Sequence, residues 1–287
     1  MTDIVAVHGI FMNRRSRQQM QDDWRSAIVR GLQNVRAGRA DEVEVECAYY
    51  GHLYNDGKAG LDAAYRPADL DTTLERELFL AIADATAIAD ATADEEAERP
   101  EPAAPTKLWA PERVQGAVRR IERHGIFDGA SGVVIRLVKQ VGRYLGDADF
   151  RERVLAELTE AMRAKPRVLV AHSLGSVVAY DWLCRQSTPT VPTLVTIGSP
   201  LGFRGIRKAL HPDLGATLPP WPGVQTWVNV AAREDAVATV KTLDGLFVGP
   251  ITDRLASNSR RTAHSATVYL QNVHTSTAMK TALRERG

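Results

Sequence analysis

The stretch that decides the fold is RVLVAHSLGSVVA, residues 167–179. Its apolar, β-branched first half predicts a buried strand that ends at Ala171, and its second half predicts a helix from Leu174. A turn this tight accepts only small residues on its two sides, and Ala171 and Gly175 stand there. Ser173 therefore lies at the carboxyl end of a strand, beside the free N–H groups that begin a helix. Its alternative interpretation is a serine that only caps the helix.

Strand and helix patterns alternate on both sides of this turn. Upstream, strands at 3–11 and 43–50 flank an amphipathic helix at 18–35, which together predict a βαβ unit. Downstream, we expect helices at 149–164, 174–185 and 275–284, strands at 167–171, 193–197 and 225–230, and a short strand or strand-edge segment at 267–270. This alternation predicts an α/β fold with a mostly parallel sheet of about six strands, covered by helices.

The segment 52–146 interrupts the alternation. Helical patterns at 71–93, 111–124 and 131–145 surround an acidic, proline-rich stretch at 94–106, which has the composition of an exposed linker. We expect 52–146 to be a helical insertion or cap after the second strand, and residues 1–287 to form a single domain.

Composition argues against several classes of protein. Lys and Arg number 36 and Asp and Glu 35, so the net charge of +1 argues against a nucleic-acid partner. No apolar run reaches the roughly 18 residues of a membrane span, so we expect no stable membrane insertion. The first apolar run begins at Ile4, so we expect no signal peptide. Cys47 and Cys184 form no CxxC pair, which favours a cytoplasmic protein without disulfides or a zinc site.

Two further motifs follow other predicted strands. The first strand runs into His8-Gly9-Ile10, and the strand at 193–197 runs into a Gly-Ser-Pro turn at 198–200. With the A-x-S-x-G turn, these motifs make the chain resemble the α/β-hydrolase superfamily, in its serine esterase and lipase branch. Ala171 departs from the glycine that is usual at that position. The likeness covers about 3–51 and 147–285, and because the family's usual first two strands are missing, it implies a shortened α/β-hydrolase fold.

The resemblance implies roles for backbone groups. In this family, an N–H just after His-Gly and the N–H after the nucleophile form the oxyanion hole. Here these would be the N–H groups of Ile10 and Leu174, with Phe11 as the alternative to Ile10, while His8 would be structural. Two such donors stabilise the negative charge that develops in acyl transfer.

The resemblance also implies a catalytic triad in the chain order serine, acid, histidine. Ser173 would be the nucleophile and His264 the base. His274 is the alternative base, whereas His211 precedes any strand that could carry the acid and fits badly.

The expected acid is Asp235, in the loop after the strand at 225–230. Its neighbour Glu234 is expected to point elsewhere. Asp244 and Asp253, later in the chain, are alternative acids. The alternative interpretation of Asp235 is a residue that only caps the helix after it.

The expected function is hydrolysis of a carboxylic ester, as in esterases and lipases, through an acyl-enzyme on Ser173. The resemblance implies a small-molecule or lipid ester as substrate, and neither a metal nor an organic cofactor. The insertion and the apolar residues of 201–223 are expected either to cover an acyl pocket or to pack in the core. A thioesterase or amidase with the same triad, and a non-catalytic ligand- or protein-binding member of the fold, are the alternatives.

Overall fold

The computed structural model describes residues 2–10, 15–55, 65–91, 111–124 and 130–284. The predicted linker at 94–106 and Phe11 lie outside these residues. Within them, the chain forms one six-stranded sheet in the order β2-β1-β3-β4-β5-β6. The strands are β1 (Ile4–Val7), β2 (Val45–Ala48), β3 (Val168–His172), β4 (Thr193–Ile197), β5 (Thr226–Ala232) and β6 (Thr252–Ala256).

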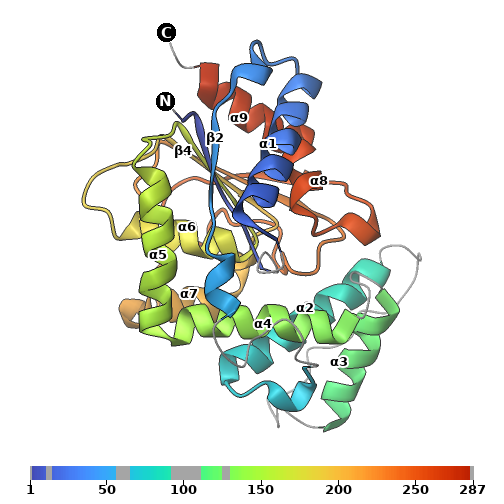
Figure 1. Ribbon diagram of the computed structural model, residues 1–287. Helices are drawn as coiled ribbons and strands as arrows, with labels where there is room; N and C mark the ends of the chain where they lie inside the picture. Colours follow the sequence, from blue (N-terminus) through green and yellow to red (C-terminus); the bar gives the residue numbers. More distant parts are fainter. Residues whose placement is uncertain (1, 11–14, 56–64, 92–110, 125–129, 285–287) are drawn as a thin grey trace.

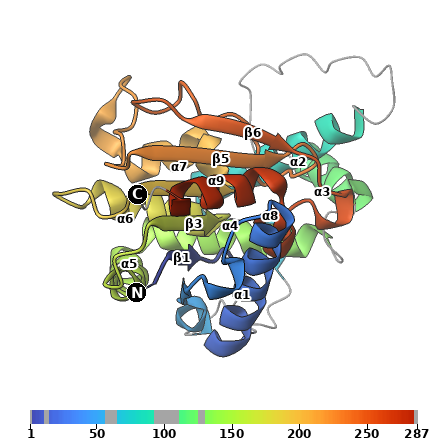
Figure 2. The same cartoon turned by 90° about the horizontal axis from the view of Figure 1, so that it is seen from above.

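Every pair of neighbouring strands is parallel, from Ile4 opposite Val45 to Ala232 opposite Ala256. Figure 2 shows the succession from β1 through β3 and β5 to β6 at the edge. Because parallel strands end at the same edge of a sheet, the loops that follow β1, β3, β4 and β5 meet there.

The sixth strand is not the one that the sequence predicts. Residues 267–270, expected to be a strand, lie in the helix α8 (Ala266–Gln271). The strand at the edge is β6, which contains Asp253 and Arg254 and exposes Leu255 to solvent. An edge strand buries little of its surface, so β6 shows none of the apolar alternation by which strands are recognised.

Helices cover both faces of the sheet (Figure 1). On one face, α1 (Arg17–Asn34), α8 and α9 (Val273–Arg284) bury side chains such as Trp24 and Met279 against Ile4 and Val170. On the other face, α5 (Ala148–Met162) and α6 (Leu174–Cys184) pack against the alternate residues of the same strands. The alternation of side chains along each strand thus divides the interior into two cores.

The segment after β2 forms α2 (Thr73–Ala91), α3 (Pro111–His124) and α4 (Ala130–Gly146), which lie together at one end of the molecule (Figure 1). Their buried side chains, Phe79 and Val138 among them, belong to the same core as α5 and α6. A polar cluster also joins α4 to this core: the Tyr144 hydroxyl donates to Asp181 Oδ2 at 2.6 Å, and Arg151 donates to both carboxylate oxygens of Asp181.

The remaining elements are short. They comprise the helix α7 (Arg204–Leu210) and single turns of 3-10 helix at Ala40–Glu42, Gly51–Asn55, Pro67–Asp69, Pro200–Gly202, Pro212–Leu214 and Arg260–Thr262. Among the described residues, no helix combines the length and apolar character needed to cross a membrane.

Candidate active site

Ser173 occupies the turn between β3 and α6, and its backbone has a conformation that residues other than glycine rarely adopt. Its φ is 53° and its ψ is −128°, a geometry that costs on the order of 1–3 kcal/mol and needs support from its surroundings. Its N–H donates to Ile197 O at 3.1 Å, and its carbonyl accepts the N–H and the hydroxyl of Ser176 at 2.9 and 2.6 Å. Ser176 Oγ also lies 2.6 Å from Ser199 Oγ, so the Gly-Ser-Pro turn helps to hold this strained residue.

The end of β1 lies directly against the turn. A Cβ on Gly175 would lie 2.4 Å from His8 O and 2.5 Å from Val7 O, and a Cβ on Gly9 would lie 2.7 Å from Ser173 Cβ. Real Cβ atoms do not make contacts this short. The two glycines are therefore required by the close approach of the His8-Gly9 segment to the start of α6.

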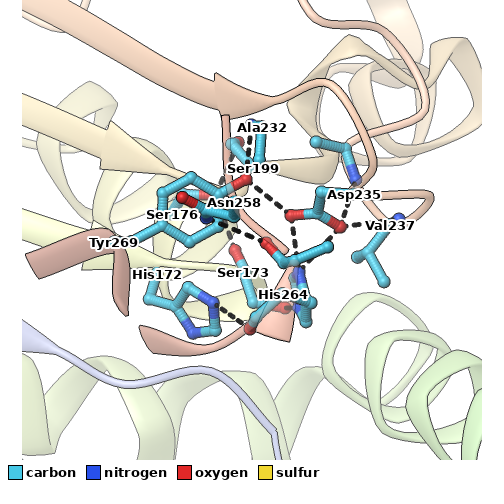
Figure 3. Close-up of polar contacts among 12 residues, drawn as sticks. His172, Ser173, Ser176, Ser199, Ala232, Asp235, Val237, Asn258, His264 and Tyr269 are labelled. Atoms are coloured by element: carbon cyan, nitrogen blue, oxygen red, sulfur yellow. Dashed lines mark hydrogen bonds and ion pairs between the residues drawn. The ribbon is translucent and has the colours of Figure 1, made fainter. Parts of the chain in front are cut away.

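Three side chains from three separate loops form one hydrogen-bonded chain (Figure 3). Ser173 Oγ lies 2.9 Å from His264 Nε2, and His264 Nδ1 lies 2.8 Å from Asp235 Oδ2 and 3.0 Å from Oδ1. Ser173 follows β3, Asp235 follows β5, and His264 stands between β6 and α8. All three are buried. The structure thus brings together the three residues for which the resemblance implies the roles of nucleophile, base and acid.

Asp235 is held as a carboxylate. Burial by itself would raise its pKa, but the neighbouring His264, Lys241 and the Tyr269 hydroxyl lower the pKa to about 2. Oδ1 accepts the N–H of Val237 at 3.0 Å. An ionised Asp235 accepts a hydrogen bond from the N–H of His264 Nδ1, so the lone pair of Nε2 is directed at the Ser173 hydroxyl.

Two residues that support this chain were not assigned from the sequence. The Tyr269 hydroxyl accepts the Ala232 N–H at 2.6 Å and donates to Asp235 Oδ2 at 2.8 Å, so it ties the acid to the end of β5. Gly198 has φ +56°, and a Cβ there would lie 2.9 Å from Asp235 Oδ2 and 3.3 Å from His264 Nδ1. The Gly-Ser-Pro motif contains Gly198, so the sequence held a signal for this close contact. Tyr269 had no such signal, because the segment 267–270 was expected to be a strand.

His172 and His8 are buried and neutral. His172 Nε2 donates to the backbone carbonyl of His264 at 3.1 Å, which anchors the loop that carries the base. Burial lowers the pKa of His172 well below its usual value and that of His8 to about 3. His8 Nε2 accepts the Tyr50 N–H at 3.0 Å, and its ring stacks on the Tyr50 ring, which agrees with a structural role.

The alternative bases lie elsewhere. His274 lines a cavity together with Thr193, Thr226 and Thr252, the first residues of β4, β5 and β6, at the opposite edge of the sheet from Ser173. His211 follows α7 and contacts the Tyr180 ring edge-on.

The alternative acids stabilise a loop. Asp253 accepts the Leu243 N–H and the Asn229 side-chain amide, and Asp244 accepts the Ile251 N–H at 3.0 Å. Both carboxylates thus organise the segment between β5 and β6, and the contact to His264 Nδ1 comes from Asp235 instead.

The residues of the two expected oxyanion donors, Leu174 and Ile10, lie near Ser173. Leu174 is the first residue of α6, so its N–H has no carbonyl within the helix. Ile10 follows Gly9, which contacts Ser173. In the part of the chain that the structure describes, neither N–H donates to another backbone carbonyl.

A cavity of about 240 Å³ adjoins the base and Ile10. Its walls come from α1 and the segment before it, from the residue before Ser173, and from the start of α8 and the loop before it: Ile10, Arg15, Met20, Asp23, Trp24, His172, His264, Ser265, Ala266 and Thr267. Among the described residues, none from the expected cover at 52–146 and 201–223 lines it. In the segment 201–223, Leu210 is buried in the core, and Phe203 and Trp221 pack against the core. These three residues fit the core-packing alternative, whereas Leu218 is exposed.

Comparison of the chain with protein-family models, with curated proteins and with solved structures finds no match. The residues and their geometry are therefore the basis on which a function is assigned.

Proposed function

We propose that this protein is a serine hydrolase with an α/β-hydrolase fold, which cleaves carboxylic esters through an acyl-enzyme on Ser173. The observation that carries this proposal is the continuous hydrogen-bonded chain from Ser173 Oγ through His264 to Asp235. The strained turn supports it further, because such conformations persist mainly where they serve a function. The parallel sheet, with the three residues placed after β3, β5 and β6 in the order serine, acid, histidine, supports the fold assignment.

Acylation follows from this geometry. His264 Nε2 removes the hydroxyl proton as Ser173 Oγ attacks the ester carbonyl, and Asp235 stabilises the imidazolium that forms. The N–H groups of Leu174 and Ile10 would receive the developing oxyanion, together with the positive end of the α6 dipole.

Breakdown of the tetrahedral intermediate then releases the alcohol, which takes the proton from His264. In the second half of the reaction, a water molecule gives its proton to His264 Nε2 and attacks the acyl group, which restores Ser173. No step requires a group from outside the chain besides substrate and water. The cavity beside His264, with Trp24 and Met20 in its wall, would hold one of the two substrate groups, and its size favours a short apolar one.

The decisive experiment is labelling with a fluorophosphonate probe, which reacts with activated serines. We expect the wild-type protein to be labelled and the Ser173→Ala variant to be unlabelled. Ser276→Ala is a matched control, because it removes another buried serine hydroxyl. Ser276 lies in α9, and its hydroxyl donates to Leu270 O. If a folded wild-type protein is not labelled, or if Ser173→Ala is labelled equally, the serine mechanism is wrong.

The identity of the base is tested separately. His264→Ala should lower kcat on a p-nitrophenyl ester by about 10⁴-fold or more, as the loss of a triad member does elsewhere, whereas His274→Ala should leave kcat unchanged. Comparison of matched ester, thioester and amide substrates then separates an esterase from a thioesterase or an amidase. A higher kcat/KM on the thioester or the amide would contradict the ester assignment while leaving the triad in place.

A further inference from the structure

A further cavity, of about 380 Å³, lies around α7, and α7 lies on the side of the molecule away from α1 and α8 (Figure 1). We call it the basic cavity. It is lined by Arg204, Arg207, Lys208, His211, Pro212, Leu214, Gly215, Ala216, Thr217, Leu218, Pro219 and Leu246. None of these residues belongs to the wall of the cavity beside His264, so the two cavities are separate sites.

The basic cavity carries positive charge without a compensating acid. Three of its lining residues are basic and none is acidic. Within the described chain, Arg204, Arg207 and Lys208 make no ion pair with a carboxylate; Arg207 is partly buried, and Arg204 and Lys208 are exposed. Burial and the neighbouring charge of Arg204 lower the pKa of Arg207. An anion in the cavity would relieve this repulsion.

Arg207 is held in place by the protein itself. Its Nη1 donates to Leu201 O at 3.1 Å and to Gly202 O at 2.6 Å, and its guanidinium carbon lies 5.9 Å from the centre of the Phe247 ring. Its position is therefore fixed before any ligand arrives, which reduces the entropy lost on binding.

The rest of the lining is largely apolar. It includes Leu214, Leu218, Pro219 and Leu246, and 45% of the Leu218 surface is exposed. The cavity thus combines cations, which suit an anionic group, with apolar side chains, which suit a hydrocarbon chain.

We propose that the basic cavity binds a small amphiphilic anion, whose carboxylate or phosphate group pairs with Arg204 and Lys208 while its short apolar chain contacts Leu218 and Leu246. Carboxylate and phosphate present the same anionic oxygens to these cations, so the two head groups are arms of one test. This binding does not depend on the chemistry of Ser173.

The test is isothermal titration of the full-length protein at low ionic strength with four probes, each kept monomeric. Octyl phosphate and octanoate carry both features, inorganic phosphate carries only the charge, and octyl glucoside carries only the chain. We expect saturable binding of at least one of the two octyl anions, weaker binding of inorganic phosphate and none of octyl glucoside. The better octyl anion identifies the head group.

Variants assign the binding to the cavity. Arg204→Ser/Lys208→Ser should weaken binding of the octyl anion by about tenfold or more, the usual effect of losing a charge-assisted hydrogen bond. Arg30→Ser/Arg163→Ser, which removes two exposed arginines elsewhere, is the charge-matched control and should bind normally. Leu218→Ser should weaken the octyl anion but not inorganic phosphate.

Three outcomes would overturn the proposal: no saturable binding of either octyl anion, equal binding of octyl glucoside, or equal weakening by both double variants. Binding to anionic phospholipid vesicles without binding of the monomeric probes would also overturn it, in favour of a membrane surface. Ser173→Ala should bind the octyl anion as the wild type does. A loss of fluorophosphonate labelling and a loss of anion binding are therefore distinguishable failures.

Discussion

At the scale of single residues, the Tyr269 hydroxyl connects the acid of the proposed triad to the sheet. It accepts the Ala232 N–H and donates to Asp235 Oδ2. In Tyr269→Phe the Ala232 N–H is left buried without its acceptor, which costs about 1–3 kcal/mol of unfolding free energy. Asp235 also loses one of its anchors, so we expect kcat on a p-nitrophenyl ester to fall about tenfold, equivalent to ~1.4 kcal/mol.

Tyr180→Phe is the matched control for this prediction. Its hydroxyl donates to Pro220 O, and it stacks among aromatic rings remote from the triad. It should lose stability without losing kcat. Urea unfolding and steady-state kinetics on both variants measure the two effects, and equal kcat values for Tyr269→Phe and the wild type would show that the hydroxyl does not position Asp235.

A second prediction at this scale concerns pH. Burial lowers the pKa of His8 to about 3 in the folded protein, whereas an exposed histidine titrates near 6.5. Between these values the unfolded chain binds more protons than the folded chain, so stability is complete above about pH 6.5 and decreases as the pH falls toward 3. The slope reaches about 1.4 kcal/mol per pH unit for one such group.

Urea unfolding at pH 7, 6 and 5 tests this prediction. His8→Gln should be less stable than the wild type at pH 7, because the stacking on Tyr50 is lost, but its stability should depend less steeply on pH. His172 contributes a slope of the same sign in both proteins, because burial lowers its pKa too. An equal slope for the two proteins would mean that His8 does not contribute.

At the scale of elements, the contact between β1 and α6 depends on Gly175. A Cβ at this position would meet the backbone carbonyl oxygens of Val7 and His8, and backbone atoms cannot turn aside as a side chain can. Gly175→Ala should therefore destabilise the protein by about 1–3 kcal/mol. It should also move the Ile10 N–H away from Ser173 and lower kcat by about a hundredfold, which is the scale for a displacement of about 1 Å.

Gly146→Ala provides the control. A Cβ there meets nothing within 4 Å, so this variant should keep the wild-type kcat and lose no stability, with a gain of up to about 1 kcal/mol possible in a helical position. If Gly175→Ala retained wild-type kcat, the end of β1 would not form part of the active site.

The buried elements of the fold could be predicted from the sequence, because burial leaves a pattern of apolar residues. The strand predicted at 193–197 has the observed bounds, and the strands predicted at 167–171 and 225–230 are displaced or extended by one or two residues. β6 could not be predicted, because only Ala256 in it is buried. Residues 267–270 contain two β-branched residues and a tyrosine, and local preference alone cannot show that this segment packs as a helix against α1.

The proximity of the site residues could be predicted only where a motif marks them. Ser173 stands in a turn whose spacing is distinctive, and the chain order then selects Asp235 and His264. Tyr269 and Gly198 act through contacts between residues distant in sequence, which no local pattern reports.

At the scale of the whole molecule, the buried carboxylate of Asp181 joins three helices. Asp181 belongs to α6, and it binds Tyr144 of α4, Arg151 of α5 and Arg185, which follows the last residue of α6. Asp181→Ala would leave the mostly buried Arg151 charge without its partner, so we expect a loss of about 3–5 kcal/mol in unfolding free energy. Glu152→Ala removes only an exposed partner of Arg185 and should cost no more than about 1 kcal/mol.

Thermal unfolding followed by circular dichroism measures both losses, and protease sensitivity of the segment 65–146 shows whether α4 detaches. A loss for Asp181→Ala no larger than that for Glu152→Ala would mean that the segment is held by apolar packing alone.

The position of β1 inside the sheet has a consequence for biosynthesis. Ile4 pairs with Val45 on one side and with Val168 on the other, across the whole of α2, α3 and α4. A chain that leaves the ribosome amino-terminus first can complete neither this pairing nor the turn at Ser173 until residues beyond 168 have emerged, and His264 follows later still. Whatever reaction the site performs, a nascent chain that has not yet reached His264 lacks one of the three side chains and cannot carry it out.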